Sequence, residues 1–259
     1  NLKNTVYPFK FNDYKSLEKI CSQNRVGVIK MEIFRNIPPK DNFLEKVRKL
    51  ASRKKIVLIF DECTSGFRES FGGLHLKYKV YPDMCILGKA LGNGFPITTI
   101  LGKRNIMENA QTSFISSTFW TERSGYVAAL KTLEIMENIK SWEIITRQGK
   151  KIKDMISKTA KKNNIEVNIS GLNACPSYSI NSKHWQEYKT FITQELLREG
   201  VLGANTTYTS ICHNDYVIRR YQDKLDKIFS LIKKIQNTDD NINNYLNGPI
   251  SHSGFKRLN

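Results

Sequence analysis

Two short apolar runs decide the fold: Ile56-Val57-Leu58-Ile59-Phe60-Asp61 and Met84-Cys85-Ile86-Leu87-Gly88-Lys89. Short unbroken apolar runs are typical of strands that are buried on both faces of a parallel sheet. The first run ends at Asp61-Glu62, and the second ends at Lys89. Open α/β sheets bind their ligands at the carboxyl ends of the strands. The sequence therefore predicts an α/β fold in which Asp61 and Lys89 carry the candidate chemistry.

The segments around these runs indicate how the chain is divided. A strand at 26–33, an amphipathic helix at 41–52 and the strand at 56–61 predict a right-handed βαβ crossover. Beyond residue 140 a long basic helix precedes further short strands, including one at 201–208, and two more helices. We expect a larger, mostly parallel-sheet domain at 1–140, a smaller α+β domain at 141–237 and a tail at 238–259.

The sequence also makes a specific prediction for one connection and for one helix of the larger domain. Residues 71–80 are predicted to form a mobile connection that leads to the strand before Lys89. Farther on, a helix is predicted at 122–136. Its buried face is expected to carry Val127, Leu130, Leu133 and Met136, which share the three-to-four-residue spacing of a packed helix.

Composition excludes several function classes. The chain has 259 residues and a formal net charge of +17, but its lysines are spread through most predicted helices, which does not favour a nucleic-acid interface. No apolar stretch approaches the roughly 20 residues that cross a bilayer. The five cysteines show neither a disulfide framework nor metal-ligand spacing, which fits a reducing cytoplasm and predicts no metal site.

Three stretches resemble a known family: Leu58–Arg68, Pro82-Asp83 and Leu87–Ile97. They closely resemble the class III aminotransferases, enzymes with the aspartate aminotransferase-like fold that depend on pyridoxal 5'-phosphate (PLP). Within this family the chain most resembles the branch of glutamate-1-semialdehyde aminomutase. The resemblance implies that Lys89 forms the Schiff base with PLP and that Asp61 pairs with the pyridine nitrogen. A carboxylate there keeps the ring protonated, so that the ring accepts electrons from a carbanion.

The resemblance also implies further cofactor contacts. Cys63 stands where relatives place a residue that packs on the ring, and the hydroxyl of Thr64 is within reach of the ring oxygen. Thr118 stands in the family's Thr-Phe turn, which binds the phosphate of the partner subunit, so we expect a homodimer with shared sites. A helix-capping role for residues 116–121 is the alternative.

Two residues near the strand at 26–33 are substrate-site candidates. Glu32 matches a family glutamate on the substrate side, although Ile33 replaces the usual proline; a solvated acid at the strand end is the alternative. Arg35 is a candidate for binding a substrate anion, or for a surface ion pair.

By the resemblance, the chain begins about midway through the large domain, so we expect a fragment that lacks the main phosphate-binding turn. The predicted function is transfer of an amino group between an amine donor and a carbonyl acceptor. Two alternatives stay open. One is intramolecular transfer of the glutamate-1-semialdehyde 2,1-aminomutase type, and the other is a catalytically silent α/β interaction module.

Overall fold

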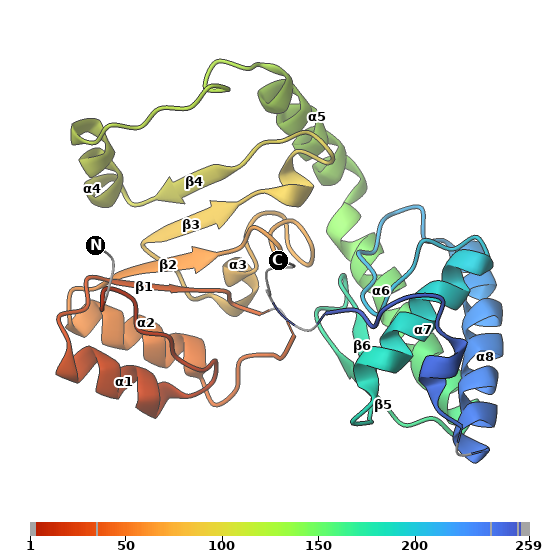
Figure 1. Cartoon of the computed structure of the whole chain (residues 1–259). Helices are drawn as coiled ribbons and strands as arrows, with labels where there is room; N and C mark the ends of the chain where they lie inside the picture. Colours follow the sequence, from red (N-terminus) through yellow and green to blue (C-terminus); the bar gives the residue numbers. More distant parts are fainter. Residues whose placement is uncertain (1–3, 35, 239, 253, 255–259) are drawn as a thin grey trace. The chain divides into compact units, whose positions relative to one another are not determined.

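The computed structural model describes residues 4–34, 36–238, 240–252 and 254. The chain divides into two compact units, Asn1–Trp142 and Glu143–Asn259 (Figure 1). No helix among the described residues is long and apolar enough to cross a membrane.

The first unit is built on a four-stranded sheet in the order β1-β2-β3-β4 (Figure 1). Strands β1 (Val28–Met31), β2 (Val57–Asp61) and β3 (Met84–Leu87) are parallel, and β4 (Thr99–Gly102) runs antiparallel to β3. The predicted parallel α/β arrangement is therefore confirmed, although β1 is shorter than the predicted strand at 26–33. The register sets Asp61 opposite Ile86, so the carboxyl ends of β2 and β3 lie side by side.

Two amphipathic helices cover one side of this sheet (Figure 1). Helix α1 (Tyr14–Gln23) begins at Asp13, whose carboxylate accepts a hydrogen bond from the Ser16 amide at 3.0 Å. Helix α2 (Phe43–Arg53) buries its apolar stripe near β2. The remaining helical segments of the unit are α3 (His75–Tyr78), η1 (Lys89–Leu91), α4 (Arg104–Met107), η2 (Glu108–Thr112) and α5 (Ser124–Ile139).

Helix α5 buries only part of the predicted face: Leu133 and Met136 pack against the core of the unit, whereas Val127 and Leu130 do not. Val127 and Leu130 were expected to be buried, but their side chains are 65% and 69% exposed within this unit. The small residues Gly125 and Ala129 are buried instead, and an added Cβ at Gly125 would lie 3.2 Å from the Ile97 side chain. A close approach through small residues therefore leaves the branched side chains outside.

Asp83, just before β3, joins three segments of the first unit. Its carboxylate accepts hydrogen bonds from the Leu58 amide at 2.8 Å, Arg48 at 2.9 Å and Lys103 at 2.7 Å. Burial alone would raise the pKa of Asp83, but these three partners lower it below its usual value. The carboxylate therefore ties the start of β3 to β2 and to the end of β4.

The second unit packs three helices against a two-stranded antiparallel sheet (Figure 1). The elements are α6 (Ser141–Lys162), β5 (Val167–Ser170), β6 (Ser177–Ile180), α7 (Trp185–Arg198), α8 (Asp215–Asn237) and the short turn η3 (Ile242–Tyr245). The buried core residues of the unit, which include Tyr178, Phe191 and Phe229, come from the three helices and from β6, and the partly buried Val167 and Ile169 of β5 pack against them.

Residues 201–208 do not form the predicted strand. The second half of this segment pairs with β6 through an antiparallel bridge, between Ser177 and Thr206. In this bridge the Tyr178 amide donates to the Asn205 carbonyl at 3.0 Å, and the Thr207 amide donates to the Pro176 carbonyl at 2.9 Å. Gly200 adopts a φ of +71°, and the Gly203 amide bonds back to the Val201 carbonyl at 2.9 Å. This local turn uses backbone groups that a longer strand would need for pairing.

The described part of the predicted tail packs on the second unit. Ile242 is buried in its core, and the Ser251 amide donates to the Thr190 hydroxyl of α7 at 2.9 Å. Residues 253 and 255–259, which end the predicted tail, lie outside the described residues.

We predict that Asp83→Asn destabilises the folded protein by about 1.5–3 kcal/mol at pH 7, because one amide cannot replace a carboxylate shared by two cations. The folded pKa of Asp83 is depressed, so its contribution is present above the unfolded pKa and is lost as pH falls through the folded value. Urea unfolding at pH 7 and pH 3 should therefore show a difference from wild type that shrinks in acid.

The matched control is Glu134→Gln, which removes an exposed helical pair with Lys131 and should cost at most about 0.5 kcal/mol. An Asp83→Asn difference that persists undiminished at pH 3 would contradict the electrostatic explanation.

Candidate active site

The parallel register brings the two candidate catalytic residues to one edge of the sheet. Asp61 is the last residue of β2, and Lys89 follows β3 by two residues. The Glu62 amide donates to the Ile86 carbonyl at 2.9 Å, which continues the β2–β3 pairing past the end of β2. Lys89 lies close enough to lower the pKa of Asp61 through its charge. The sequence prediction that these residues lie together agrees with this geometry.

The backbone around Lys89 is shaped to point its amine at the connection after β2. Lys89 has a φ of +42°, a left-handed conformation that is uncommon for a residue with a side chain. At Gly88, an added Cβ would lie 2.9 Å from Cys63 Sγ and 3.0 Å from Thr98 Cγ2, so only glycine fits there without a shift. The Lys89 Nζ donates to the Thr64 hydroxyl at 2.7 Å.

Both oxygens of Asp61 have partners. Its Oδ1 accepts from the Cys63 amide at 3.2 Å, and its Oδ2 pairs with Lys30 Nζ at 3.0 Å. Burial would raise the pKa of Asp61, but the Lys30 and Cys63 hydrogen bonds and the charges of Lys30 and Lys89 outweigh it and lower the pKa. Asp61 is therefore an anion at neutral pH, with Cys63 and Thr64 beside it in sequence.

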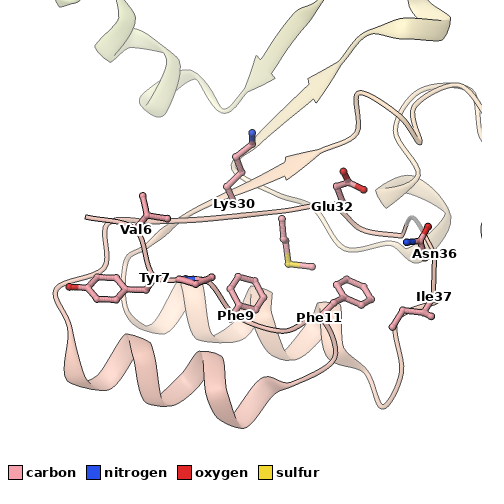
Figure 2. A pocket seen from close by; sticks show the side chains of 10 residues that line it. Val6, Tyr7, Phe9, Phe11, Lys30, Glu32, Asn36 and Ile37 are labelled. Carbon is pink, nitrogen blue, oxygen red and sulfur yellow. The ribbon is translucent and has the colours of Figure 1, made fainter. Parts of the chain in front are cut away.

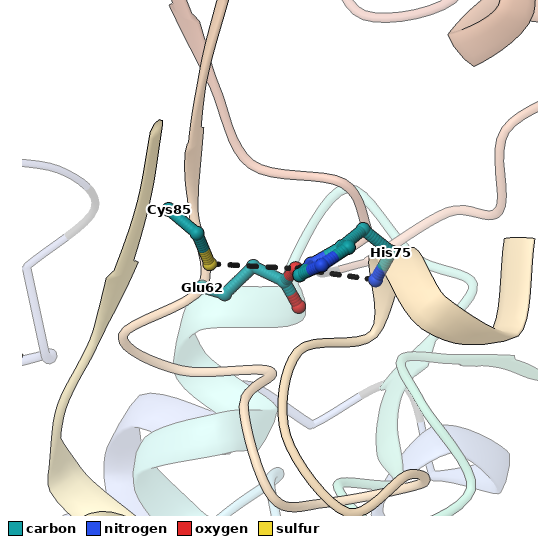
Figure 3. A group of neighbouring side chains, drawn as sticks. All are labelled: Glu62, His75 and Cys85. Carbon is teal, nitrogen blue, oxygen red and sulfur yellow. Dashed lines mark hydrogen bonds and ion pairs between the residues drawn. The ribbon is translucent and has the colours of Figure 1, made fainter. Parts of the chain in front are cut away.

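The second carboxylate at this strand end, Glu62, anchors the connection that follows it. Glu62 is 0% exposed. It accepts hydrogen bonds from the Ser65 hydroxyl, from the Leu74 and His75 amides and from His75 Nδ1, which lies 2.6 Å from Oε1. Figure 3 shows that His75 and Cys85 approach this carboxylate together. Residues 71–80 were predicted to be a mobile connection, but the hydrogen bonds of Leu74 and His75 to Glu62 hold this segment at the end of β2.

The ligand atoms of Glu62, His75 and Cys85 all lie within 4.8 Å of one another, a spacing that metal sites also show. Burial, followed by the nearby Glu62 charge, raises the pKa of the Cys85 thiol to about 12. The Cys85 thiol lies 3.9 Å from Glu62 Oε1 and donates to it. We interpret the cluster as a hydrogen-bonded anchor.

Two other predicted site residues, Thr118 and Glu32, lie on other segments of the chain. Thr118 is exposed on a turn closed by a 3.2 Å hydrogen bond from the Trp120 amide to the Ser117 carbonyl. Glu32 is half-buried immediately after β1. Arg35 lies outside the described residues.

Glu32 lines a pocket of about 580 Å³ beside β1 (Figure 2). In Figure 2, Lys30 and Glu32 rise from one side of β1, and aromatic side chains such as Phe9 and Phe11 lie on the other. Asp61 and Lys89 do not line this pocket. Lys30 lines the pocket and also pairs with Asp61, so the pocket lies beside the candidate site.

Sequence reasoning missed three residues of the site: Lys30, Glu62 and His75. Lys30 could have been recognised from the sequence, because it is a charged residue inside an apolar run. It lies two positions before Glu32, so the two side chains point to the same face of the strand. The Glu62–His75 contact had no such signal, because thirteen positions and an irregular connection separate the two residues.

Comparison with known proteins identifies related sequences and folds. The family profile described as "Aminotransferase class-III" matches residues 36–235. A 3-aminobutyryl-CoA aminotransferase of Cloacimonas acidaminovorans is 32% identical over 231 residues, which are 85% of this chain and 54% of the relative. A glutamate-1-semialdehyde 2,1-aminomutase of Ignicoccus hospitalis is 29% identical over 244 residues, 86% of this chain and 58% of the relative.

Solved structures agree on the fold. The PLP internal aldimine form of the FumI protein from Sphingopyxis sp. MTA144 superimposes with a TM-score of 0.83 at 19% identity, covering 90% of this chain and 59% of that one. Ornithine aminotransferase from Toxoplasma gondii gives a TM-score of 0.75 at 20% identity, with the same two coverages. The chain therefore spans somewhat more than half the length of the proteins that it matches, and the predicted aspartate aminotransferase-like fold is confirmed.

We predict that Glu62→Gln loosens the connection at residues 63–75. The glutamine NH₂ group is a donor, so it would face the amides of Leu74 and His75, which now donate to the Glu62 carboxylate. A buried donor left without an acceptor costs about 1–3 kcal/mol. Native-state hydrogen exchange should show faster exchange at the Leu74 and His75 amides, while the amides of α8 keep their protection. Unchanged protection of Leu74 and His75 would show that Glu62 is not the anchor.

Proposed function

This chain belongs to the class-III aminotransferase family, and from that membership we propose that it forms part of a PLP-dependent enzyme that moves an amino group. Lys89 would bind the cofactor covalently as a Schiff base, and Asp61 would hold its pyridine nitrogen. The substrates would be a small amine donor and a carbonyl acceptor. PLP supplies an electron-accepting ring that stabilises negative charge beside the transferred nitrogen.

The observation that carries this proposal is the placement of a carboxylate and an amine at adjacent strand ends. The lowered pKa of Asp61 fits a group that must remain an anion beside a protonated ring nitrogen. Thr64 lies 2.7 Å from Lys89 Nζ, so its hydroxyl can orient the amine and bind a neighbouring oxygen. Cys63 lies against Gly88, where its thiol can pack on a planar ring. This set of side chains fits PLP.

Lys89 would also move the proton between the two carbons that flank the transferred nitrogen, because its amine is the nearest base at this strand end. Asp61 does not move a proton in this proposal; it fixes the charge of the ring nitrogen. Glu32, at the end of β1, would face the substrate side.

Intramolecular amino transfer is the second candidate, favoured by the similarity to glutamate-1-semialdehyde 2,1-aminomutases. The two candidates use the same Lys89 and Asp61, and they differ in whether donor and acceptor are one molecule. Incubating the complete protein with PLP and glutamate-1-semialdehyde, without a second substrate, separates them: 5-aminolevulinate forms only in the intramolecular case.

A homodimer with shared sites completes the proposal. The turn of Thr118 and the start of α5 expose large apolar side chains, including Phe119, Trp120 and Leu130. An exposed apolar patch next to a polar turn is typical of a protein interface. In a two-fold dimer one chain can present Thr118 to the phosphate that the other chain holds.

The first test maps the cofactor lysine. Borohydride treatment of the complete protein with PLP should fix the pyridoxyl group to Lys89, and Lys89→Arg should abolish both the label and the absorbance of the protein-bound cofactor. Peptide mass spectrometry measures the label. A pyridoxyl group on another lysine would refute the assignment, and an unlabelled wild-type protein would support the silent interaction module instead.

The second test asks whether Thr118 acts across a dimer. One hydrogen bond to the charged phosphate is worth about 1.5–3 kcal/mol, so Thr118→Ala should weaken PLP binding roughly ten- to a hundredfold. A heterodimer of Lys89→Ala and Thr118→Ala chains has one site with both lesions and one with neither. At limiting PLP, borohydride should therefore label the Thr118→Ala chain far more in the heterodimer than in its own homodimer.

Equal labelling of the Thr118→Ala chain in the heterodimer and in the homodimer would show that Thr118 does not reach the partner's cofactor. The control is Thr118→Ser, which keeps the hydroxyl and should bind PLP nearly as wild type does.

A further inference from the structure

Asp61 is already engaged by a cation of this chain. Lys30 Nζ lies 3.0 Å from Asp61 Oδ2, and the Cys63 amide occupies Oδ1. The side chain of Lys30 is 55% exposed and that of Asp61 is 27% exposed, so the pair lies at the margin of the site and not in the core.

The geometry of the sheet explains why Lys30 reaches this carboxylate. β1 and β2 are parallel neighbours, with Lys30 opposite Ile59 and Asp61 two residues farther along β2. Alternate residues of a strand share a face, so Ile59 and Asp61 point to the same side. The burial pattern of both strands places Lys30 and Asp61 on their less buried face. A long side chain at position 30 therefore ends beside the Asp61 carboxylate.

We propose that Lys30 is a second cationic partner of Asp61, which competes with the protonated ring nitrogen of PLP and so limits how strongly this site holds the cofactor in its protonated form. This inference rests on the proposed function. Lys30 acts through Asp61 and is a positioning residue. It would set the electron-accepting strength of the ring without touching the substrate.

The sign of the effect follows from the charges. The Asp61 carboxylate favours a proton on the ring nitrogen, whereas an ammonium group on the same carboxylate repels that proton. Lys89 also contributes positive charge near Asp61, but in the proposed enzyme its amine is bound to the cofactor. Removing the charge of Lys30 should therefore raise the pH at which the ring nitrogen loses its proton and should strengthen PLP binding.

The experiment measures the ring nitrogen directly. The complete protein is loaded with PLP labelled with ¹⁵N in the ring, the ¹⁵N chemical shift is followed against pH, and the PLP dissociation constant is determined by spectral titration. Lys30→Met should move the deprotonation of the ring nitrogen to higher pH and tighten PLP binding about threefold to fivefold, the range for a half-exposed ion pair. Lys30→Arg keeps the charge and should behave as wild type.

A matched control is available in the same unit. Lys103 is also 55% exposed and pairs with a carboxylate, Asp83, at 2.7 Å, away from the proposed site. Lys103→Met should leave the ring nitrogen titration and the PLP affinity unchanged. In an Asp61→Asn background, Lys30→Met should bring no gain, because the shared partner is gone.

The outcomes separate the two claims. If wild type binds PLP at Lys89 and Lys30→Met changes neither the titration nor the affinity, the competition is refuted and the proposed function stands. If Lys103→Met has the same effect as Lys30→Met, general loss of charge is the cause and the inference fails. If wild type binds no PLP, both the inference and the proposed function fail.

Discussion

A fully buried carboxylate is stable only where donors surround it, and Glu62 meets that condition by gathering a hydroxyl, two backbone amides, an imidazole and a thiol. Because those donors come from β3 and from the connection between β2 and β3, the connection has little freedom to move away from the strand end. Cys63 and Thr64 lie inside the segment that is fixed in this way. The anchor therefore positions the polar groups beside Asp61 without contacting a ligand itself.

The same strand ends combine two opposite uses of a carboxylate. Asp61 and Glu62 are adjacent in sequence, but the strand directs them to opposite faces of the sheet. Glu62 faces the buried side, where protein donors bind its oxygens, and Asp61 faces the open side, where Lys30 and the Cys63 amide stabilise its charge. One residue thus maintains the local structure, while its neighbour keeps a charge available for a ligand. Exchanging the two roles would require a shift of one residue in the β2 register.

The sequence determines much of this site because its main elements are local. An apolar run that stops at Asp61 and another that stops near Lys89 are visible without any structure, and parallel pairing then brings their ends together. The Glu62–His75 contact depends on the path of an irregular connection, so no periodicity could reveal it. Residues 201–208 show a second limit. Their apolar and β-branched residues favour a strand, but turns at Gly200 and Gly203 occupy the first half, so backbone bonds to residues 176–178 begin only at Asn205. Lys30 could have been predicted from the sequence. It is the charged residue inside an apolar strand and lies two positions before Glu32, and residues two apart in a strand point to the same face.

In the proposed enzyme, two parts of the site would depend on different kinds of packing. Asp61 and Lys89 are held by strands whose inward residues, such as Leu58 and Phe60, are buried by the unit's own core. Their spacing is therefore a property of this unit and does not need a partner chain. Thr118 lies instead on a turn whose apolar neighbours are exposed, so its placement would be completed only when another surface covers Phe119 and Trp120. Retention of the phosphate would then depend on assembly, whereas the charge relation between Asp61, Lys30 and Lys89 would already exist in each chain before assembly.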